Sequence, residues 1–279
     1  MIRNPHVKLN LGLRVLRRRP DGFHDLETLF VPCHNLHDTL EIITGDDYSR
    51  TLAGLRERYS PQQMVQAVSP DGLVMVTLAR KQGVDWDPLK DLTVRAYYLL
   101  AADYRLPPVK IFLEKTSPVG AGLGGGSADA AVALQMLSEL CGLGLSVAQL
   151  AAYAARLGSD CAFFLYDTPM FGTGRGEILD PFPFDFSRFR IRIVVPEGIS
   201  VSTAEAYRGI VPAVPELPLK EVLRRDVSEW KDLLVNDFER TVFAAHPALA
   251  TLKQQLYDEG ALYASMSGSG SALFGLFPR

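Results

Sequence analysis

A glycine-rich segment between a predicted strand and a predicted helix constrains this chain more than any other feature. Residues 120–127 read Gly-Ala-Gly-Leu-Gly-Gly-Gly-Ser, with five glycines in the first seven positions. An alternating apolar strand at 109–113 precedes the segment, and a helix with an apolar stripe follows it to about Cys141. A tight turn that uses glycine only for positive φ angles needs one or two glycines. The run therefore predicts an anion site, most naturally for phosphate, made of backbone N–H groups and the positive end of the helix dipole.

Two standard nucleotide-binding motifs fit this loop poorly. The spacing G-x-G-x-x-G occurs at Gly120, Gly122 and Gly125, but a dinucleotide-binding unit would return to a strand after the helix. The sequence predicts a second helix there instead. A Walker A loop needs a lysine after its last glycine, whereas this run continues with Gly126 and Ser127. We therefore expect a phosphate held by amides and a helix dipole, with any cationic side chain supplied from elsewhere.

The lysines that could supply this charge belong to two predicted strands. Residues 7–15 alternate strictly between apolar and polar side chains, which is typical of a half-buried strand. Lys8 and Asn10 project from the polar face of this strand about 6.6 Å apart, and Gly12 leaves room beside them. Lys115 ends the strand that leads into the glycine-rich loop. Lys8 and Lys115 are therefore the candidates for contacting a bound phosphate.

An acidic residue stands at the start of a strongly apolar stretch beyond the two helices. Asp160 follows the glycine that ends the second helix, and residues 161–165 are apolar. A carboxylate in such surroundings must be paired or have a raised pKa. One interpretation is an N-cap for a short helix over 161–165. The other pairs Asp160 with Lys8, because an ammonium group keeps the acid ionised and provides positive charge where phosphoryl transfer needs it.

Composition excludes several classes of protein. The 279 residues carry a net charge of −3 and a pI of about 6.0, which excludes a protein built to coat nucleic acid or anionic lipid. The three cysteines form no C-x-x-C motif, so we expect a reduced, cytoplasmic compartment. The sequence begins without an apolar signal core and contains no apolar run of about 18 residues, so we expect no membrane partner.

Two other kinds of site have little support in the sequence. His34 and His37 are too sparse for a metal centre without a third ligand, and the sequence does not show which residues would hold a metal ion. The sequence also lacks the G-x-S-x-G nucleophile elbow, so a serine hydrolase has no support.

The remaining pattern predicts an α+β protein of two lobes. Further strands are expected at 26–30, 38–43, 73–78, 191–195 and 272–277, and further helices at 92–102, 146–157, 203–207, 219–224, 237–243 and 247–259. Asp91 and Ser146 stand in N-cap positions of two of these helices. We interpret residues 46–70 as an insertion with a short helical stretch at 61–68. A break near Tyr166 predicts one domain over 1–165 and another over 166–279.

Taken together, these residues resemble the GHMP kinases, which include galacto-, homoserine, mevalonate and phosphomevalonate kinases. Residues 118–127 match the family's Pro-x-x-x-Gly-Leu-Gly-Gly-Gly/Ser-Ser phosphate loop, which lacks the P-loop lysine. Residues 266–271 are similar to its C-terminal glycine motif. The resemblance implies a two-lobed GHMP kinase fold with the active site in the cleft between the lobes. It also implies ATP as phosphate donor with Mg²⁺, for which Ser127 is a candidate ligand.

A narrower resemblance concerns the branch of this family that phosphorylates a cytidylyl methylerythritol in the non-mevalonate isoprenoid pathway. Residues 5–11 and 19–30 are similar to the A-K-x-N-L and R-x-D-G-Y-H-x-L-x-T-L-F motifs of that branch, and residues 157–160 to its L-G-A-D segment. The resemblance spans residues 5 to 277. It implies phosphate transfer from ATP to the 2-hydroxyl of this small molecule.

The same resemblance implies roles for individual residues. Asp160 matches the catalytic base, and Lys8 matches the residue that orients it and stabilises the transferring charge. The implied substrate contacts are Asn10, Phe23, His24, Thr203 and Tyr207, with His24 at the cytosine edge and Phe23 and Tyr207 on its two faces. The implied ATP contacts are Pro118, Gly120, Gly122, Gly124, Gly125, Gly126, Ser127 and Lys115, and residues 268–270 would line the cleft.

The sequence departs from the family pattern at two positions. Phe23 replaces the commoner tyrosine, which removes a hydroxyl but keeps the stacking face, and Asp91 stands where asparagine is usual. Ordinary core packing is the alternative role for Phe23 and Tyr207.

Rival functions make different demands on these residues. A homoserine or mevalonate type of kinase would not need Phe23, His24 or Tyr207. A non-catalytic nucleotide-binding protein on the same fold and a dinucleotide oxidoreductase are the rivals from other classes.

Overall fold

The computed structural model describes residues 1–45 and 47–279 and divides the chain into two compact units. Unit 1 contains Met1–Val7, Cys33–Ser117 and Gly124–Asp167, and unit 2 contains Lys8–Pro32, Pro118–Leu123 and Thr168–Arg279. This division differs from the predicted domains 1–165 and 166–279, because residues 8–32 and 118–123 group with the later part of the chain. Strand pairing gives the reason, since an early strand pairs with a strand that follows residue 168.

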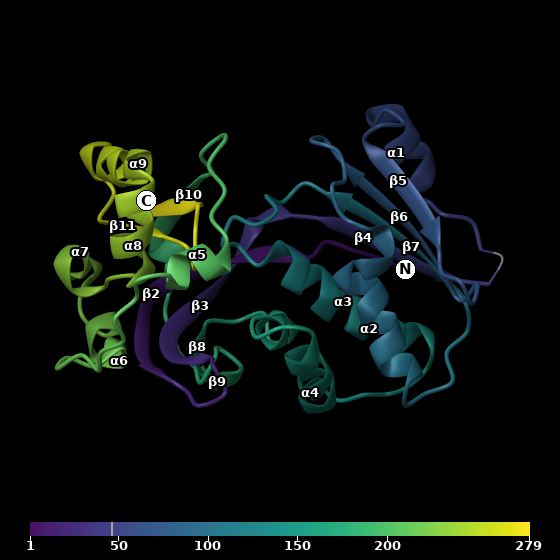
Figure 1. Ribbon diagram of the computed structural model, residues 1–279, viewed down its shortest axis with the longest axis horizontal. Helices are drawn as coiled ribbons and strands as arrows, with labels where there is room; N and C mark the ends of the chain where they lie inside the picture. Colours follow the sequence, from purple (N-terminus) through teal and green to yellow (C-terminus); the bar gives the residue numbers. More distant parts are fainter. Residues whose placement is uncertain (46) are drawn as a thin grey trace. The chain divides into compact units, whose positions relative to one another are not determined.

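Unit 1 is built on a five-stranded sheet of order β1-β4-β7-β6-β5, in which β6 and β7 run parallel and the other neighbours antiparallel. The strands are β1 (Ile2–Arg3), β4 (Thr39–Thr44), β5 (Met64–Val68), β6 (Val74–Arg80) and β7 (Val109–Lys115). The helices are α1 (Leu52–Arg58), α2 (Leu92–Ala101), α3 (Gly125–Leu140) and α4 (Val147–Leu157), with the short 3₁₀ helices η1 (Pro88–Lys90) and η2 (Cys161–Leu165). Helix α3 packs against α2, α4, η2 and strand β4, so it occupies the centre of the helical layer (Figure 1).

Two predicted helix starts in unit 1 are confirmed by their caps. The Asp91 carboxylate accepts hydrogen bonds from the Thr93 backbone N–H (2.9 Å) and hydroxyl (2.7 Å), and its other oxygen accepts from the Trp86 indole N–H (3.1 Å). Aspartate in place of asparagine is therefore accommodated as the N-cap of α2. Ser146 begins α4 with a capping box, in which Gln149 makes the reciprocal bond.

The helical stretch predicted at 61–68 is wrong. Residues Met64–Val68 form strand β5, which pairs antiparallel with β6 through a turn closed by a hydrogen bond from the Ser69 N–H to the Val74 carbonyl. The Pro-Asp-Gly sequence within that turn favours a hairpin over a helix. The helix of this segment is instead α1, whose Leu55 is buried. The predicted insertion begins at Asp46, which lies outside the described residues.

Unit 2 contains a four-stranded sheet of order β2-β3-β8-β9 and a three-stranded sheet of order β10-β12-β11. The strands are β2 (His6–Arg18), β3 (His24–His37), β8 (Met170–Thr173), β9 (Ile178–Pro181), β10 (Phe189–Val194), β11 (Tyr263–Met266) and β12 (Leu273–Pro278), and the first residues of β2 and last residues of β3 belong to unit 1. The helices are α5 (Thr203–Tyr207), α6 (Leu219–Leu223), α7 (Trp230–Leu233), α8 (Phe238–Ala245) and α9 (Pro247–Asp258), with the 3₁₀ helices η3 (Phe186–Arg188) and η4 (Val227–Glu229).

The core of unit 2 lies where α8 and α9 cover the three-stranded sheet. Helix α9 packs against β11 and β12, and its Leu249 and Leu256 are buried together with Val242, Met266 and Leu273. The predicted α+β class is confirmed by these mixed layers of helices and sheets (Figure 1). Among the described residues, no helix is both long enough and apolar enough to span a membrane.

Candidate active site

The lysine and asparagine of strand β2 are buried in unit 2 with their polar atoms joined. Lys8 and Asn10 are 3% and 2% exposed. The Lys8 ammonium donates to Asn10 Oδ1 and, over 3.0 Å, to the carbonyl oxygen of Gly122. Asn10 Nδ2 donates to Thr28 Oγ1 (3.0 Å), whose hydroxyl donates to the carbonyl of Gly12 (2.6 Å). The prediction that Lys8 and Asn10 lie side by side is confirmed, and Lys8 contacts the glycine-rich loop through one of its carbonyl groups.

The C-terminal glycine motif contacts the same group of atoms. Ser267 Oγ donates to the Gly122 carbonyl oxygen over 3.0 Å and accepts from the Asn10 backbone N–H over 3.3 Å. A Cβ atom on Gly122 would overlap the carbonyl oxygen of Ser267. One on Gly268 would lie 3.3 Å from Lys8 Nζ. The φ angles of the two glycines are 75° and 55°, so the close approach and the backbone conformation both require glycine there.

A buried asparagine that sequence reasoning missed holds the C-terminal glycine motif in place. Asn236 is 2% exposed, and its Nδ2 donates to the carbonyl oxygens of Met266 and Gly268, both over 2.8 Å. Its Oδ1 accepts from the backbone N–H of Phe238 at the start of α8. The available signal in the sequence was a polar residue just before a predicted helix. Such a residue predicts an N-cap more readily than a support for a loop 30 residues away.

The N-terminus of α3 has the features of an anion site. Gly124 precedes the helix with φ 72°, and among the described residues no side chain caps the first turn. The first turn also contains no acidic residue, and a Cβ atom on Gly126 would have Leu92 as its nearest neighbour at 3.7 Å. The first amides of a 16-residue helix therefore lack a side-chain partner, which suits a phosphate group. The predicted contacts of the loop with ATP phosphates stay predictions, although this geometry fits them.

The carboxylate of Asp160 is not used as a helix cap. Asp160 does occupy the N-cap position of η2, but its side chain makes no capping hydrogen bond. The residue is partly exposed, whereas residues 161–165 are buried. Its neighbour Cys161 is inert as a thiol, because burial raises its pKa to about 12 and a hydrogen bond with Ser127 offsets this only in part. Lys8 and Asp160 belong to different units, and their pairing stays a prediction.

Lys115 lies in a buried cluster beneath the first turn of α3. It is 5% exposed, and its ammonium donates to Asp38, to Asp129 (2.6 Å) and to the Ser117 hydroxyl (3.2 Å). Asp38 also accepts from the Thr116 and Ser117 backbone N–H groups, both over 2.7 Å. Burial alone would lower the pKa of Lys115, but its interactions with the hydrogen-bonded side chains of Asp129 and Asp38 outweigh it and raise the pKa, so the lysine stays charged. A contact between Lys115 and ATP stays a prediction, and these bonds favour a supporting role under the loop.

Asp129, the second acid of this cluster, makes the stability of the fold depend on pH. Burial raises the pKa of Asp129 well above its ordinary value against the opposing effect of Lys115, and its Oδ1 has no hydrogen-bond partner among the described residues. The folded state therefore keeps a proton that the unfolded chain loses above about pH 4. Because the folded state binds more protons than the unfolded chain, Asp129 lowers the free energy of unfolding as pH rises above about pH 4. Urea titrations at a series of pH values should show that the free energy of unfolding decreases less with rising pH in Asp129→Asn than in the wild type. An equal decrease in both proteins would contradict the raised pKa of Asp129.

The predicted cytosine-binding residues gather in unit 2, but in an arrangement that sequence reasoning did not foresee. The His24 ring stacks on Tyr207, with centroids 4.7 Å apart and planes at 21°. Phe23 is 52% exposed, and the Arg175 guanidinium lies 4.8 Å from its ring centre. Burial, aided by Arg18, lowers the pKa of His24, so its imidazole is neutral at pH 7. A neutral imidazole has one donor and one acceptor nitrogen, as reading a base edge requires.

Thr203 begins the short helix α5, whose last residue is Tyr207. Ser202 caps this helix by accepting from the Glu205 backbone N–H over 3.1 Å. The Thr203 side chain is exposed, and its contact with substrate stays a prediction.

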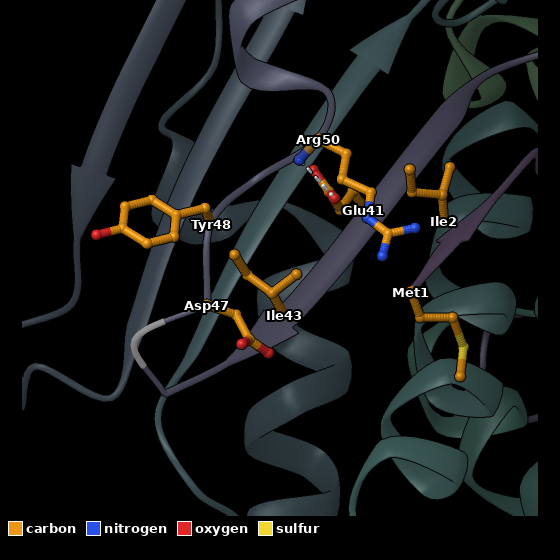
Figure 2. A pocket seen from close by; sticks show the side chains of 7 residues that line it. All are labelled: Met1, Ile2, Glu41, Ile43, Asp47, Tyr48 and Arg50. Carbon is orange, nitrogen blue, oxygen red and sulfur yellow. Dashed lines mark hydrogen bonds between the residues drawn. The ribbon is translucent and has the colours of Figure 1, made fainter.

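A cavity of about 480 Å³ in unit 1 is separate from these predicted residues. It is lined by Met1, Ile2, Glu41, Ile43, Asp47, Tyr48 and Arg50 (Figure 2). The Glu41 carboxylate is turned to its own loop, where it accepts from the Ser49 hydroxyl over 2.6 Å and from the Arg50 N–H over 3.0 Å. None of the residues predicted to bind ATP or substrate lines this cavity.

Comparison with known proteins agrees with the motifs. The chain matches the family models of the GHMP kinases N terminal domain over residues 91–168 and the GHMP kinases C terminal region over residues 218–279. It is 42% identical to a 4-diphosphocytidyl-2-C-methyl-D-erythritol kinase of Parabacteroides distasonis, over 100% of this chain and 92% of the relative. The kinase of the same name from Bacteroides thetaiotaomicron is 44% identical, over 99% of this chain and 92% of the relative.

Solved structures show the same relationship. A crystal structure of 4-(cytidine 5'-diphospho)-2C-methyl-D-erythritol kinase is 32% identical, with a TM-score of 0.73 over 99% of this chain and 90% of that one. A homoserine kinase from Cytophaga hutchinsonii has a TM-score of 0.63 at 19% identity, over 98% of this chain and 85% of that one, which shows the fold alone. This chain therefore belongs to the GHMP kinases, a family of small-molecule phosphotransferases.

Proposed function

We propose that this chain catalyses the ATP-dependent phosphorylation of the 2-hydroxyl of 4-diphosphocytidyl-2-C-methyl-D-erythritol. The observation that carries the proposal is the buried network in which Lys8 contacts Asn10 and the Gly122 carbonyl, since it joins the N-terminal motif to the phosphate loop. The name shared by relatives at 42% and 44% identity supports the choice of substrate. The product would belong to the non-mevalonate isoprenoid pathway, and three free cysteines support a cytoplasmic setting.

The proposed reaction moves one phosphoryl group and one proton. The oxygen of the substrate's 2-hydroxyl forms a bond to the γ-phosphorus of ATP, and Asp160 accepts the proton of that hydroxyl. The bond from that phosphorus to the bridging oxygen breaks, and ADP leaves. Lys8 orients the acid and stabilises the charge on the transferring group. Phosphoryl transfer needs little more from a protein than this positioning and charge stabilisation.

The proposed ATP site is the N-terminus of α3 and the loop before it. In this proposal the amides of residues 120–127 contact the phosphates, and the dipole of α3 favours the negative charge there. Mg²⁺ bound with ATP would neutralise charge on the phosphate oxygens, with the Ser127 hydroxyl as the candidate ligand from this chain. The uncapped first turn of α3 supports this assignment, because an acidic side chain there would compete with the phosphate.

A panel of alcohols tests the proposed substrate. We expect ADP release by the purified chain, measured in a coupled assay, to require the cytidylyl methylerythritol and to be at background with homoserine or mevalonate. Turnover of one of the other alcohols with a higher kcat/KM would favour a sister kinase. An absence of ADP release with every alcohol would favour a non-catalytic nucleotide-binding protein.

The exposed ring of Phe23 provides the sharpest test of cytosine stacking. Because base stacking on an aromatic ring contributes about 1–3 kcal/mol, we expect Phe23→Ala to raise the KM for the cytidylyl substrate about 5- to 150-fold. The KM for ATP should not change. Tyr48→Ala is the matched control, since Tyr48 is 94% exposed and lies in unit 1. An unchanged substrate KM in Phe23→Ala would contradict this role.

A further inference from the structure

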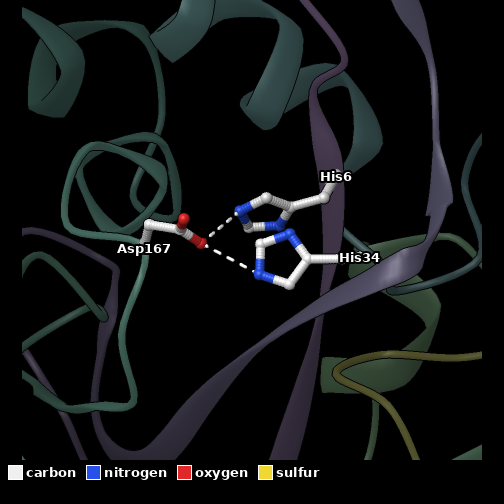
Figure 3. A group of neighbouring side chains, drawn as sticks. All are labelled: His6, His34 and Asp167. Carbon is white, nitrogen blue, oxygen red and sulfur yellow. Dashed lines mark ion pairs between the residues drawn. The ribbon is translucent and has the colours of Figure 1, made fainter.

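Two histidines and an aspartate from three distant segments meet within unit 1. His6 belongs to the start of β2, His34 to the end of β3, and Asp167 to the segment after η2. Asp167 Oδ1 lies 2.9 Å from His6 Nε2 and 3.2 Å from His34 Nε2 (Figure 3). One nitrogen of each imidazole and one carboxylate oxygen lie within 4.8 Å of one another. These residues play no part in the proposed kinase reaction.

The hydrogen bonds of His6 leave the correct nitrogen for binding a metal ion. His6 Nδ1 lies 3.0 Å from the carbonyl oxygen of Val7. A carbonyl oxygen only accepts, so Nδ1 carries a hydrogen. Nε2 faces the Asp167 carboxylate, and a metal ion would take its lone pair once the hydrogen that it shares with Asp167 is released. Metal-binding histidines are commonly held in this way, by a bond from the other ring nitrogen to a backbone carbonyl. The His6 ring also packs against Phe164, with 5.7 Å between the ring centroids. The His6 side chain is only 12% exposed.

We propose that His6, His34 and Asp167 form a binding site for a transition-metal dication of the Zn²⁺ type. Zn²⁺ binds imidazole nitrogen and carboxylate oxygen at about 2.0–2.2 Å, so ligand atoms around a tetrahedral ion are separated by about 3.3 Å. The separations of the two imidazole nitrogens from Asp167 Oδ1, 2.9 and 3.2 Å, are near this value, and the two nitrogens themselves lie within 4.8 Å of each other. Two imidazoles favour Zn²⁺ over Mg²⁺, which prefers oxygen ligands. His34 and Asp167 are both 61% exposed, so an ion can enter and a water molecule can complete the coordination.

The position of the three ligands in the chain gives the site a structural consequence. Each lies within two residues of a point where the chain passes between unit 1 and unit 2, at 7/8, 32/33 and 167/168. A bound ion would therefore tie together the three segments of unit 1, next to points where the chain leaves or enters this unit. We expect Zn²⁺ to raise the midpoint of thermal unfolding, because an ion that binds only the folded chain stabilises it by mass action.

Metal titration of the chelator-treated protein tests this site. We expect isothermal titration with ZnCl₂ in the presence of excess Mg²⁺ to give one Zn²⁺ per chain. His34→Ala should weaken binding at least about tenfold, because loss of even an outer partner of a metal ligand costs about 10- to 100-fold. His6→Asn should do the same while keeping an N–H group where Nδ1 donates. His37→Ala is the matched control, an exposed histidine of the same strand, and should bind as the wild type does.

Three results would overturn the proposal. The first is the absence of stoichiometric Zn²⁺ binding by the wild type. The second is wild-type affinity in His34→Ala and His6→Asn, with circular dichroism showing that both variants are folded. The third is a thiolate charge-transfer band when Co²⁺ replaces Zn²⁺ as a spectroscopic probe, because this band would show that a cysteine is a ligand of the bound ion. Visible bands of four-coordinate Co²⁺ that disappear in His34→Ala would support it.

Discussion

Replacing Asp160 with asparagine is expected to lower kcat by about 10²- to 10⁴-fold, the usual contribution of a positioned general base. Asparagine has nearly the same shape as aspartate but cannot accept the proton of the 2-hydroxyl. The side chain makes no capping bond to η2, so the substitution removes no helix cap. The KM for ATP should change little, because the proposed phosphate contacts are amides of residues 120–127. Steady-state assays of ADP release, with both substrates varied, measure these effects.

Asp103→Asn is the matched control for this prediction. Asp103 is an exposed acid of the same unit, and its carboxylate accepts only from the Tyr153 hydroxyl among the bonds described. We expect this variant to keep wild-type kcat. If Asp160→Asn retained more than about a tenth of the wild-type kcat, the proposed role of Asp160 as base would be rejected, since such a small loss is below the range of general base catalysis.

Replacing Lys115 with methionine is expected to lower the free energy of unfolding by about 3–5 kcal/mol, because it leaves the buried Asp38 carboxylate without its cation. Asp38 is fully buried and its carboxylate accepts from the Lys115 ammonium, which also donates to an oxygen of the buried Asp129. Methionine fills a similar volume, so the loss would come from the charge and its hydrogen bonds. Urea unfolding followed by circular dichroism measures the change.

Lys110→Met controls for the loss of a lysine from the same strand. Lys110 lies on β7 and its ammonium donates to the Asp47 carbonyl over 3.3 Å at the surface. We expect this control to remain within about 0.5 kcal/mol of the wild type. A loss of less than about 1 kcal/mol in Lys115→Met, together with a raised KM for ATP, would contradict the supporting role and favour a direct contact of Lys115 with phosphate.

Most of the fold could be predicted where local signals agree with the tertiary structure. Strand β2 follows from strict alternation, and α2 and α4 follow from apolar spacing with N-caps at Asp91 and Ser146. The segment at 61–68 could not be predicted in this way, because its short apolar run fits a helix or a strand. Pairing with β6 decides the outcome, and pairing is a long-range contact.

The candidate site could be predicted in residue types but not in all its contacts. Alternation placed Lys8 beside Asn10, and the glycine motifs pointed to phosphate. The role of Asn236 was missed, because its bonds to Met266 and Gly268 join residues far apart in the sequence. The burial of Lys115 between two acids was missed for the same reason, since Asp38 is 77 residues away. Local patterns report the face on which a side chain lies, whereas its partner depends on how the strands pair.

Phosphorus-31 NMR of a reaction mixture tests the central claim most directly. The purified chain would be incubated with ATP, Mg²⁺ and 4-diphosphocytidyl-2-C-methyl-D-erythritol. The account predicts a new phosphate monoester resonance on the 2-hydroxyl, in amounts equal to the ADP formed, and its absence in Asp160→Asn. ADP accompanied only by inorganic phosphate, or a phosphate ester on another hydroxyl, would contradict it.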